Sequence, residues 1–166
     1  MKEKALDRLF YETLKDIYYA ERKILKALPK MARGAETAEL KKAFNDHCAE
    51  TERQVERLQK VFEICGKRAQ GKTCEAIEGI IAEGEEVLEE FKGQPAQDAG
   101  LISSAQAVEH YEIARYGTLK CWAEMLGMPD AVKLLDQNLQ EEIKADALLT
   151  KIAEGAVNEH AMERAA

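Results

Sequence analysis

The sequence predicts an all-α fold, and two observations support this class. Apolar residues recur at spacings of three and four over long stretches and never alternate for long with polar ones, which is typical of amphipathic helices rather than strands. The 3 prolines and 10 glycines fall in clusters that separate these stretches, as expected for connections between helices. A chain of 166 residues is long enough for one domain with its own hydrophobic core.

Two long helices are predicted in the first part of the chain. The first runs from about Ala5 to about Arg33, and Pro29 is expected to kink it because proline removes a backbone hydrogen bond. The second runs from about Thr37 to just before Gly66. A threonine hydroxyl can accept a hydrogen bond from the first turn of a helix, and a glycine often follows a helix end.

Three further helices are predicted in the remaining part of the chain. They run from about Cys74 to Phe91, from about Ala96 to Leu126, and from Pro129 to about Ala153. Proline is favoured at the first position of a helix, which supports the start of the last one. We therefore expect a helical bundle over residues 1–154 and a loosely helical C-terminal tail over residues 155–166.

The lengths of the connections predict the topology. Only a few residues join the first long helix to the second, and the third to the fourth, so each pair is expected to form an antiparallel hairpin. Roughly 30 residues, which include the short helix, separate the two pairs and are enough to return along the bundle. Two hairpins with one long crossover form the ferritin-like four-helix bundle, here with a short extra helix in the crossover.

Charge and composition exclude several classes of protein. The 24 Lys and Arg residues against 31 Asp and Glu residues give a net charge of −7, whereas binding of a nucleic-acid backbone needs a basic surface. No segment approaches the roughly 20 apolar residues of a membrane helix, and residues 1–16 lack the apolar core of an export signal. We expect a cytoplasmic protein whose four cysteines are free, buried thiols rather than partners in a Cys65–Cys74 disulfide.

Acidic residues interrupt the apolar stripe of every long helix near its middle. Together with one histidine, the candidate inward-facing polar residues are Glu21, His47, Glu50, Glu109, Glu112, Glu142 and Asp146. Other polar and aromatic residues are expected to have structural positions: His110 lies at the surface or in an interface, Glu141 faces solvent, and the packing residues are Tyr18, Tyr111, Tyr116 and Trp122.

The candidate carboxylates lie at matched depths along the bundle. Glu112 and Glu142 each stand 14 residues from the ends of their shared connection, at Leu126 and Met128. Glu21 and Glu50 stand 12 and 13 residues from theirs, provided that the first helix continues through its proline. Since a helix rises about 1.5 Å per residue, the members of each pair should lie level. If the two hairpins dock in register, all four carboxylates gather in one cluster.

Such a cluster needs positive charge. Burying an ionised carboxylate costs several kcal/mol, and neighbouring carboxylates raise each other's pKa. Two divalent cations would offset four or five negative charges, and hard oxygen ligands suit iron, manganese or magnesium. Di-iron and di-manganese bundles use a glutamate from each of two helices and Glu-x-x-His from the other two.

Three segments are specific enough to indicate a family: LKDIYYAERKILKALPKMA, HCAETERQVERLQKVFEICG and AQAVEHYEIARYGTLKCWAEMLG. In these segments, and over nearly the whole chain to about residue 154, the sequence resembles the YciF-like stress proteins. These form a branch of the ferritin-like superfamily that is distantly related to rubrerythrin. The resemblance implies a ferritin-like fold and a homodimer, and it implies no particular reaction.

The resemblance also assigns roles residue by residue. Glu21 matches the carboxylate of the first helix, and Glu109 and Glu112 look like the paired glutamates of the third; Glu50 and Glu142 match those of the second and fourth. The expected histidines are replaced, by Arg53 three residues after Glu50 and by Ala145 three residues after Glu142. His47, at the reversed spacing, could supply a nitrogen ligand, and Asp146 could supply an oxygen ligand.

Two functions follow from these features. The first is a stress-associated protein with a dimetal-carboxylate site, holding two iron or manganese ions and handling dioxygen, peroxide or metal ions. The alternative is a metal-free, dimeric helical bundle with a structural or interaction role in the stress response. Iron storage in a cage is a third, weaker hypothesis. No catalytic residue is identified, and the sequence does not decide whether the protein is an enzyme.

Overall fold

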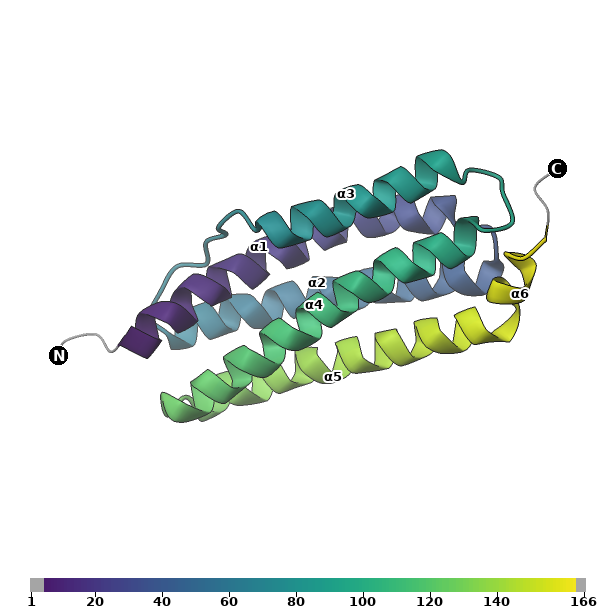
Figure 1. The fold of residues 1–166 in the computed structure, drawn as a ribbon. Coiled ribbons are helices and arrows are strands. Elements are labelled where there is room, and N and C mark those ends of the chain that lie inside the picture. The colour runs from purple at the N-terminus through teal and green to yellow at the C-terminus, as the bar shows by residue number, and fades with distance from the viewer. Residues whose placement is uncertain (1–4, 164–166) are drawn as a thin grey trace.

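The computed structural model describes residues 5–163, and this part of the chain contains helices and no strand (Figure 1). The helices are α1 (Ala5–Gly34), α2 (Ala38–Ile64), α3 (Glu75–Glu90), α4 (Gln97–Met125) and α5 (Pro129–Ile152). A π-helical segment, η1 (Ala153–Val157), and the short helix α6 (Asn158–His160) follow without a break. Each predicted helix is found, with ends within one or two residues of the expected positions.

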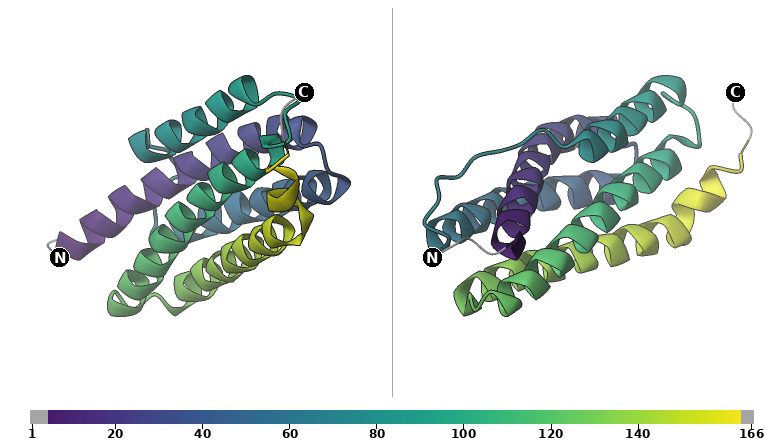
Figure 2. Two further views of the ribbon diagram at one scale, coloured as in Figure 1. Left: turned by 45° about the vertical axis from the view of Figure 1, so that its right-hand side comes forward. Right: turned by 60° about the vertical axis from the view of Figure 1, so that its left-hand side comes forward.

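The four long helices form two antiparallel hairpins, as predicted. α1 packs against α2 and α4 packs against α5, and the hairpins meet where α2 contacts α5 and α1 contacts α4. α3 lies outside this bundle, along α4 and α1 (Figures 1 and 2). The all-α bundle with an extra helix in its crossover is therefore confirmed.

Local sequence signals explain where the helices begin and end. The side chain of Thr37 accepts a hydrogen bond from the Leu40 backbone N–H at 3.4 Å, which caps α2. Gly66 and Gly127 follow α2 and α4 with φ angles of 63° and 74°, a region that glycine enters without steric cost. Pro29 lies inside α1, and the helix continues past it to Gly34.

One buried carboxylate links the two hairpins at the end of the bundle. Asp98 of α4 accepts hydrogen bonds from the backbone N–H groups of Glu36 and Thr37, at 2.8 and 2.9 Å. Next to it, the Gln97 side chain donates to the Gly34 carbonyl oxygen. These contacts tie the α1–α2 connection to the start of α4. They therefore help to set the register between the hairpins, and this register decides whether the carboxylates of the two hairpins lie level.

The cysteines and the C-terminal segment differ in part from expectation. All four cysteines are free, as predicted, but only Cys74 is buried, and Cys121 is exposed because it lies on the outer face of α4. The expectation of buried thiols is therefore wrong for Cys121. Beyond Ile152 the chain remains helical as far as His160, and Val157 is buried against the bundle; residues 164–166 of the predicted tail lie outside the described residues.

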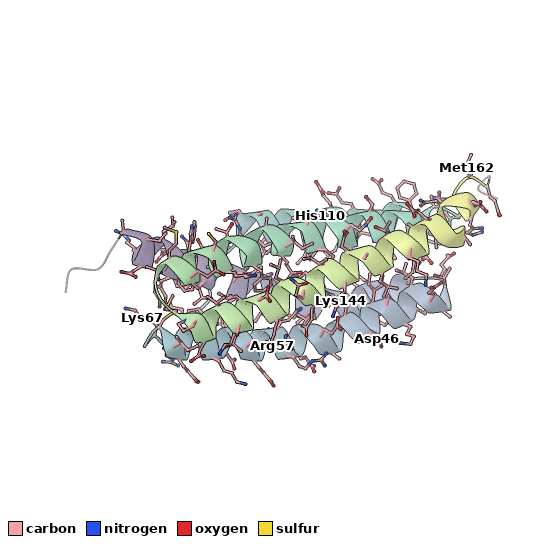
Figure 3. All side chains as sticks on the ribbon, turned by 90° about the horizontal axis from the view of Figure 1, so that it is seen from below. Asp46, Arg57, Lys67, His110, Lys144 and Met162 are labelled. Atoms are coloured by element: carbon pink, nitrogen blue, oxygen red, sulfur yellow. The ribbon has the colours of Figure 1, made fainter. Side chains whose placement is uncertain are left out.

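Charged side chains cover the outer faces of the bundle. Seen from below, Asp46 of α2 and Lys144 of α5 both lie on the exposed edge where these helices meet, and Arg57 lies further along the same edge (Figure 3). None of the described helices combines the length and apolar character that a membrane span requires.

Candidate metal centre

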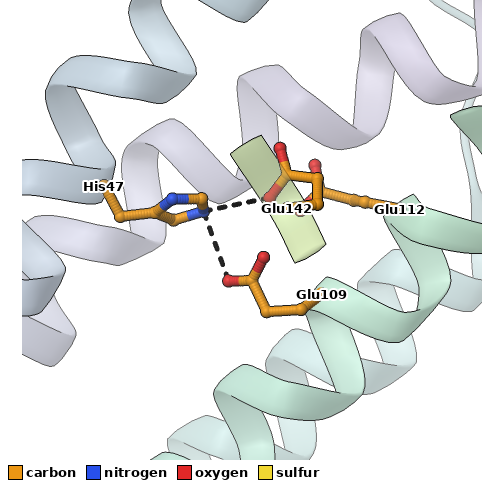
Figure 4. Close-up of side chains that lie close together, drawn as sticks. All are labelled: His47, Glu109, Glu112 and Glu142. Carbon is orange, nitrogen blue, oxygen red and sulfur yellow. Dashed lines mark ion pairs between the residues drawn. The ribbon is translucent and has the colours of Figure 1, made fainter. Parts of the chain in front are cut away.

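Four buried side chains from three helices converge in the middle of the bundle. They are His47 of α2, Glu109 and Glu112 of α4, and Glu142 of α5 (Figure 4). Each offers one nitrogen or oxygen atom, and these four atoms all lie within 4.8 Å of one another. The two glutamates of α4 are three residues apart and so project from the same face of their helix.

The histidine lies between carboxylates on both sides of its ring. Its Nε2 atom is 3.3 Å from Glu109 Oε1 and 3.6 Å from Glu142 Oε2 (Figure 4). Its Nδ1 atom is 3.4 Å from Glu50 Oε2. The ring therefore presents Nε2 to the cluster and Nδ1 to the more exposed Glu50.

The cluster contains buried polar atoms without hydrogen-bond partners. Of the eight such side-chain atoms in residues 5–163, six belong to this region. They are Glu21 Oε2, His47 Nε2, Glu109 Oε2, both carboxylate oxygens of Glu112, and Glu142 Oε2. Leaving one buried polar group unpaired costs about 1–3 kcal/mol. A cation bound among these six oxygen and nitrogen atoms would satisfy them.

Burial and mutual repulsion shift the pKa values of these acids upward. Burial raises the pKa of Glu21 to about 8, with a further increase from the charge of Glu142. Burial also raises the pKa of Glu109 to about 7, although its contact with Glu142 opposes the shift. The pKa values of Glu112 and Glu142 lie well above the usual range, again mainly because of burial. Protons or metal ions must therefore offset the charge at neutral pH.

The pKa of His47 is raised, whereas burial alone would lower the pKa of a histidine. Burial lowers the pKa of His47, but its hydrogen bond to Glu50 and the charges of Glu142 and Glu21 together raise the pKa above its ordinary value. The pKa of Glu50 is lowered, chiefly by the same hydrogen bond. Both shifts have the cause expected for a ring surrounded by carboxylates.

Glu21 adjoins the cluster and is oriented by a tyrosine. It is fully buried on α1, and the Tyr116 hydroxyl of α4 donates a hydrogen bond to its Oε1 atom, which leaves Oε2 free. Tyr116 was predicted as a packing residue, and it is buried, but it also has this polar role. Tyr116 stands four residues after Glu112 and so lies on the same face of α4, and this spacing is the sequence signal that could have indicated its polar role.

A second polar layer supports Glu142. Gln54 of α2 donates to Oε1 of Glu142, and to Oε2 of Glu141 at 3.1 Å. Arg57 holds Glu141 with two hydrogen bonds, at 2.7 and 2.9 Å, and also donates to Asn138 at 2.9 Å. The prediction that Glu141 faces solvent is therefore wrong, because the facing Arg57 draws it into this layer.

The remaining two candidates lie at or outside the edge of the cluster. Glu50 is partly exposed and contacts the cluster only through His47. Asp146 accepts a hydrogen bond from Gln106 at 3.0 Å and lies 3.3 Å from His110 Nε2, on the outer side of α4 and α5. His110 is 68% exposed, as its predicted surface position requires.

Known proteins are similar to this chain in sequence and fold. A family model described as a domain of unknown function, DUF892, matches residues 5–162. The protein YciF of Escherichia coli (strain K12) is 42% identical over 166 residues, which is 99% of this chain and 100% of YciF.

Solved structures agree with this match. The crystal structure of the E. coli stress protein YciF has a TM-score of 0.89 at 42% identity, covering 96% of this chain and 99% of that chain. YcfI from Rhodopseudomonas palustris has a TM-score of 0.86 at 45% identity, covering 90% and 95%. A protein from Xanthomonas campestris shares the fold, with a TM-score of 0.73 at 23% identity over 95% of this chain and 96% of that one.

Proposed function

Because the chain belongs to the DUF892 family, a domain family of unknown function, we propose its function from the buried cluster, which we infer binds iron or manganese. The resemblance to the YciF-like proteins is confirmed by the E. coli relative, a stress protein. We place this chain in the same class of stress-associated proteins, and we infer from its own buried cluster that its bundle holds divalent metal ions.

One observation carries the proposal: four ligand atoms from three helices lie within 4.8 Å of one another, deep in the bundle. Ligands bind such ions at about 2 Å, so opposite ligands of one ion lie about 4 Å apart. The cluster is therefore close to the size of one coordination sphere. Carboxylate oxygens with a single imidazole nitrogen suit iron and manganese better than softer metals.

The proposed ligands form an inner and an outer group. His47, Glu109, Glu112 and Glu142 would hold the first ion. Glu21, with one oxygen free beside the cluster, is the candidate additional ligand of a second ion, whereas Glu50 lies across the histidine ring and contacts its Nδ1 atom. Asp146 is better placed to bind Gln106 than to reach the cluster, so we leave it out of the ligand set.

The protein's own residues prepare this site. Gln54 and Tyr116 each occupy one oxygen of a carboxylate and so orient the other towards the cluster. A proton on His47 Nδ1 would be held by Glu50, which leaves the lone pair of Nε2 for a cation. Glutamates that are protonated in the metal-free protein would lose their protons as the cation binds. The metal ions would supply redox chemistry, which suits handling of dioxygen, peroxide or the metals themselves.

The second candidate function is a structural one without metal. It is favoured by the R. palustris relative YcfI, for which a structural role has been suggested. In this case the buried carboxylates would remain protonated and hydrogen-bonded to one another. The two functions differ in whether a metal ion stabilises the fold, since a ligand that binds only the native state must raise its stability.

Metal analysis tests the proposal directly. Protein purified without chelator, and again after anaerobic loading with Fe²⁺ or Mn²⁺, should contain at least one ion per chain and unfold at a higher temperature than the metal-free protein. Glu112→Gln should lose the metal, whereas Glu89→Gln, at an exposed position on α3, should retain it. Negligible metal after loading, with no change in stability, would favour the structural function.

A further inference from the structure

An apolar cavity of about 40 Å³ lies beneath α3 and leads to the cluster. Its walls come from α1, α2, α3 and α4, and its apolar lining includes Ile24, Leu28, Ile80, Leu88, Ala105 and Val108. Two side chains of the candidate metal centre, His47 and Glu109, are among the residues that line it. Figures 1 and 2 show α3 lying along α1 and α4, and residues of α3 form one wall of the cavity.

The size and the lining of the cavity restrict what it can hold. By the same measure one water molecule needs about 10–15 Å³, so the space suits a molecule of at most about three or four heavy atoms. Its walls are almost wholly hydrocarbon, and water there would lack most of its two to four polar partners. Cavities of this kind stay dry and bind small apolar molecules such as xenon.

A second, different opening reaches the same two side chains. It lies between α2 and α5, has a volume of about 150 Å³, and is lined by Asp46, Glu50 and Lys144 as well as by His47 and Glu109. Asp46 and Lys144 lie on the exposed edge labelled in Figure 3. The carboxylates of Asp46 and Glu50, set among apolar side chains, give this opening oxygen atoms that can contact a hydrated cation, whereas the walls beneath α3 are almost wholly hydrocarbon.

We propose that the cavity beneath α3 binds a small apolar molecule of the size of dioxygen beside His47 and Glu109, while cations reach the cluster through the opening between α2 and α5. The delivery of such a molecule to a metal rests on the proposed function. The binding of the molecule itself does not, because the apolar walls are present without metal.

α3 packs closely against α4 over the cavity. Gly84 is buried, and a Cβ atom at this position would lie 3.4 Å from Ser104 Cβ, so the two helices pack in close contact there. At the exposed rim, Lys30 Nζ of α1 lies 2.9 Å from Glu85 Oε1 of α3. Packing of α3 on α4 therefore borders the cavity on one side, and this ion pair lies at its outer edge.

Xenon is the probe for the metal-free protein. Methyl NMR signals of residues such as Ile24 and Ile80 should shift with xenon pressure and saturate. Ala27→Leu and Ala105→Val, two independent substitutions that fill the cavity, should abolish these shifts. Ala145→Leu is the matched control, because Ala145 is a half-buried alanine that lines the other opening. It should leave the xenon shifts unchanged.

Uptake of Mn²⁺, followed in the same variants, separates the two approaches. Ala145→Leu should slow uptake, and Ala27→Leu should leave it unchanged. Absence of saturable xenon binding in the wild type, or xenon shifts that persist in both cavity-filling variants, would overturn the inference even if Mn²⁺ binds. Slower Mn²⁺ uptake in Ala27→Leu would contradict the proposal that cations and the small apolar molecule reach the cluster by different routes. Failure of the wild type to bind Mn²⁺, with xenon binding intact, would overturn the proposed function alone.

Discussion

The hydroxyl of Tyr116 on α4 donates a hydrogen bond to Oε1 of Glu21 on α1, and both side chains are fully buried. A residue of the second hairpin therefore orients a carboxylate of the first. The bond occupies one oxygen of Glu21 and leaves the other free beside the cluster. Tyr116 is not one of the proposed metal ligands and acts on the cluster through Glu21, so we treat it as a positioning residue.

Replacing this tyrosine tests its role. Tyr116→Phe leaves Glu21 Oε1 without a partner, and the free energy of unfolding of the metal-free protein should fall by about 1–3 kcal/mol. Mn²⁺ affinity should also decrease, because Glu21 is no longer held in place. Urea unfolding with and without Mn²⁺ measures both effects.

Tyr18→Phe provides the control for that variant. Tyr18 is also buried on α1, but its hydroxyl accepts its hydrogen bond from the exposed Gln59 at 3.2 Å, away from the cluster. Its loss should leave Mn²⁺ affinity unchanged. Equal losses of Mn²⁺ affinity in both variants would show that Tyr116 acts only through general packing.

The histidines offer a second, sharper comparison. His47→Ala removes the one nitrogen of the cluster and should weaken Mn²⁺ binding by about tenfold or more, since even outer contacts of a metal site contribute that much. His110→Ala, at a 68% exposed position, should have no effect. Isothermal titration of the metal-free proteins with Mn²⁺ measures both affinities. Unchanged binding by His47→Ala would remove the histidine from the ligand set.

The fold could be predicted in detail because its signals are local. Thr37 caps α2 through its own side chain, and Gly127 follows the end of α4 with a positive φ angle, so both boundaries can be predicted from a few neighbouring residues. The matched depth of Glu112 and Glu142 also follows from counting residues on either side of one short connection.

The details of the site depend on helix rotation and on neighbours distant in sequence. Asp146 lies one turn beyond Glu142, where the facing residue of α4 is Gln106 rather than a member of the cluster. Glu141 is drawn to Arg57 on α2, 84 residues away in the sequence. Neither partner can be deduced from the periodicity of a single helix, because periodicity gives a face but not the side chain that meets it.

Raised pKa values predict how the metal-free protein responds to pH. The pKa of Glu21 rises from 4.5 to about 8 on folding, so the folded state binds more protons than the unfolded state between these values. Stability is then fully present below pH 4.5 and is lost as the pH rises towards about 8. His47, whose pKa is also raised, contributes with the same sign at pH values above its ordinary 6.5.

Urea unfolding in the presence of chelator should therefore show a falling midpoint from mildly acidic to mildly alkaline pH. Addition of Mn²⁺ at the alkaline end should restore stability, because the cation replaces the protons that offset the buried charge. The same titration on Glu112→Gln, which has one fewer buried acid, should show a weaker pH dependence. A midpoint that is constant or rises with pH would contradict the assignment of buried, protonated carboxylates.

Asp98 should be essential for stability although it lies far from the cluster. It accepts backbone hydrogen bonds from Glu36 and Thr37 and is only 4% exposed. Asp98→Ala leaves two donors at the α1–α2 connection without their charged partner, which should lower the free energy of unfolding by about 2–4 kcal/mol. Asp130→Ala, at an exposed position whose carboxylate contacts only Lys133 among the ion pairs of the described chain, should change it by less than about 0.5 kcal/mol. If Asp98→Ala is equally mild, the two hydrogen bonds do not fix the register between the hairpins, and packing of α1 against α4 must do so.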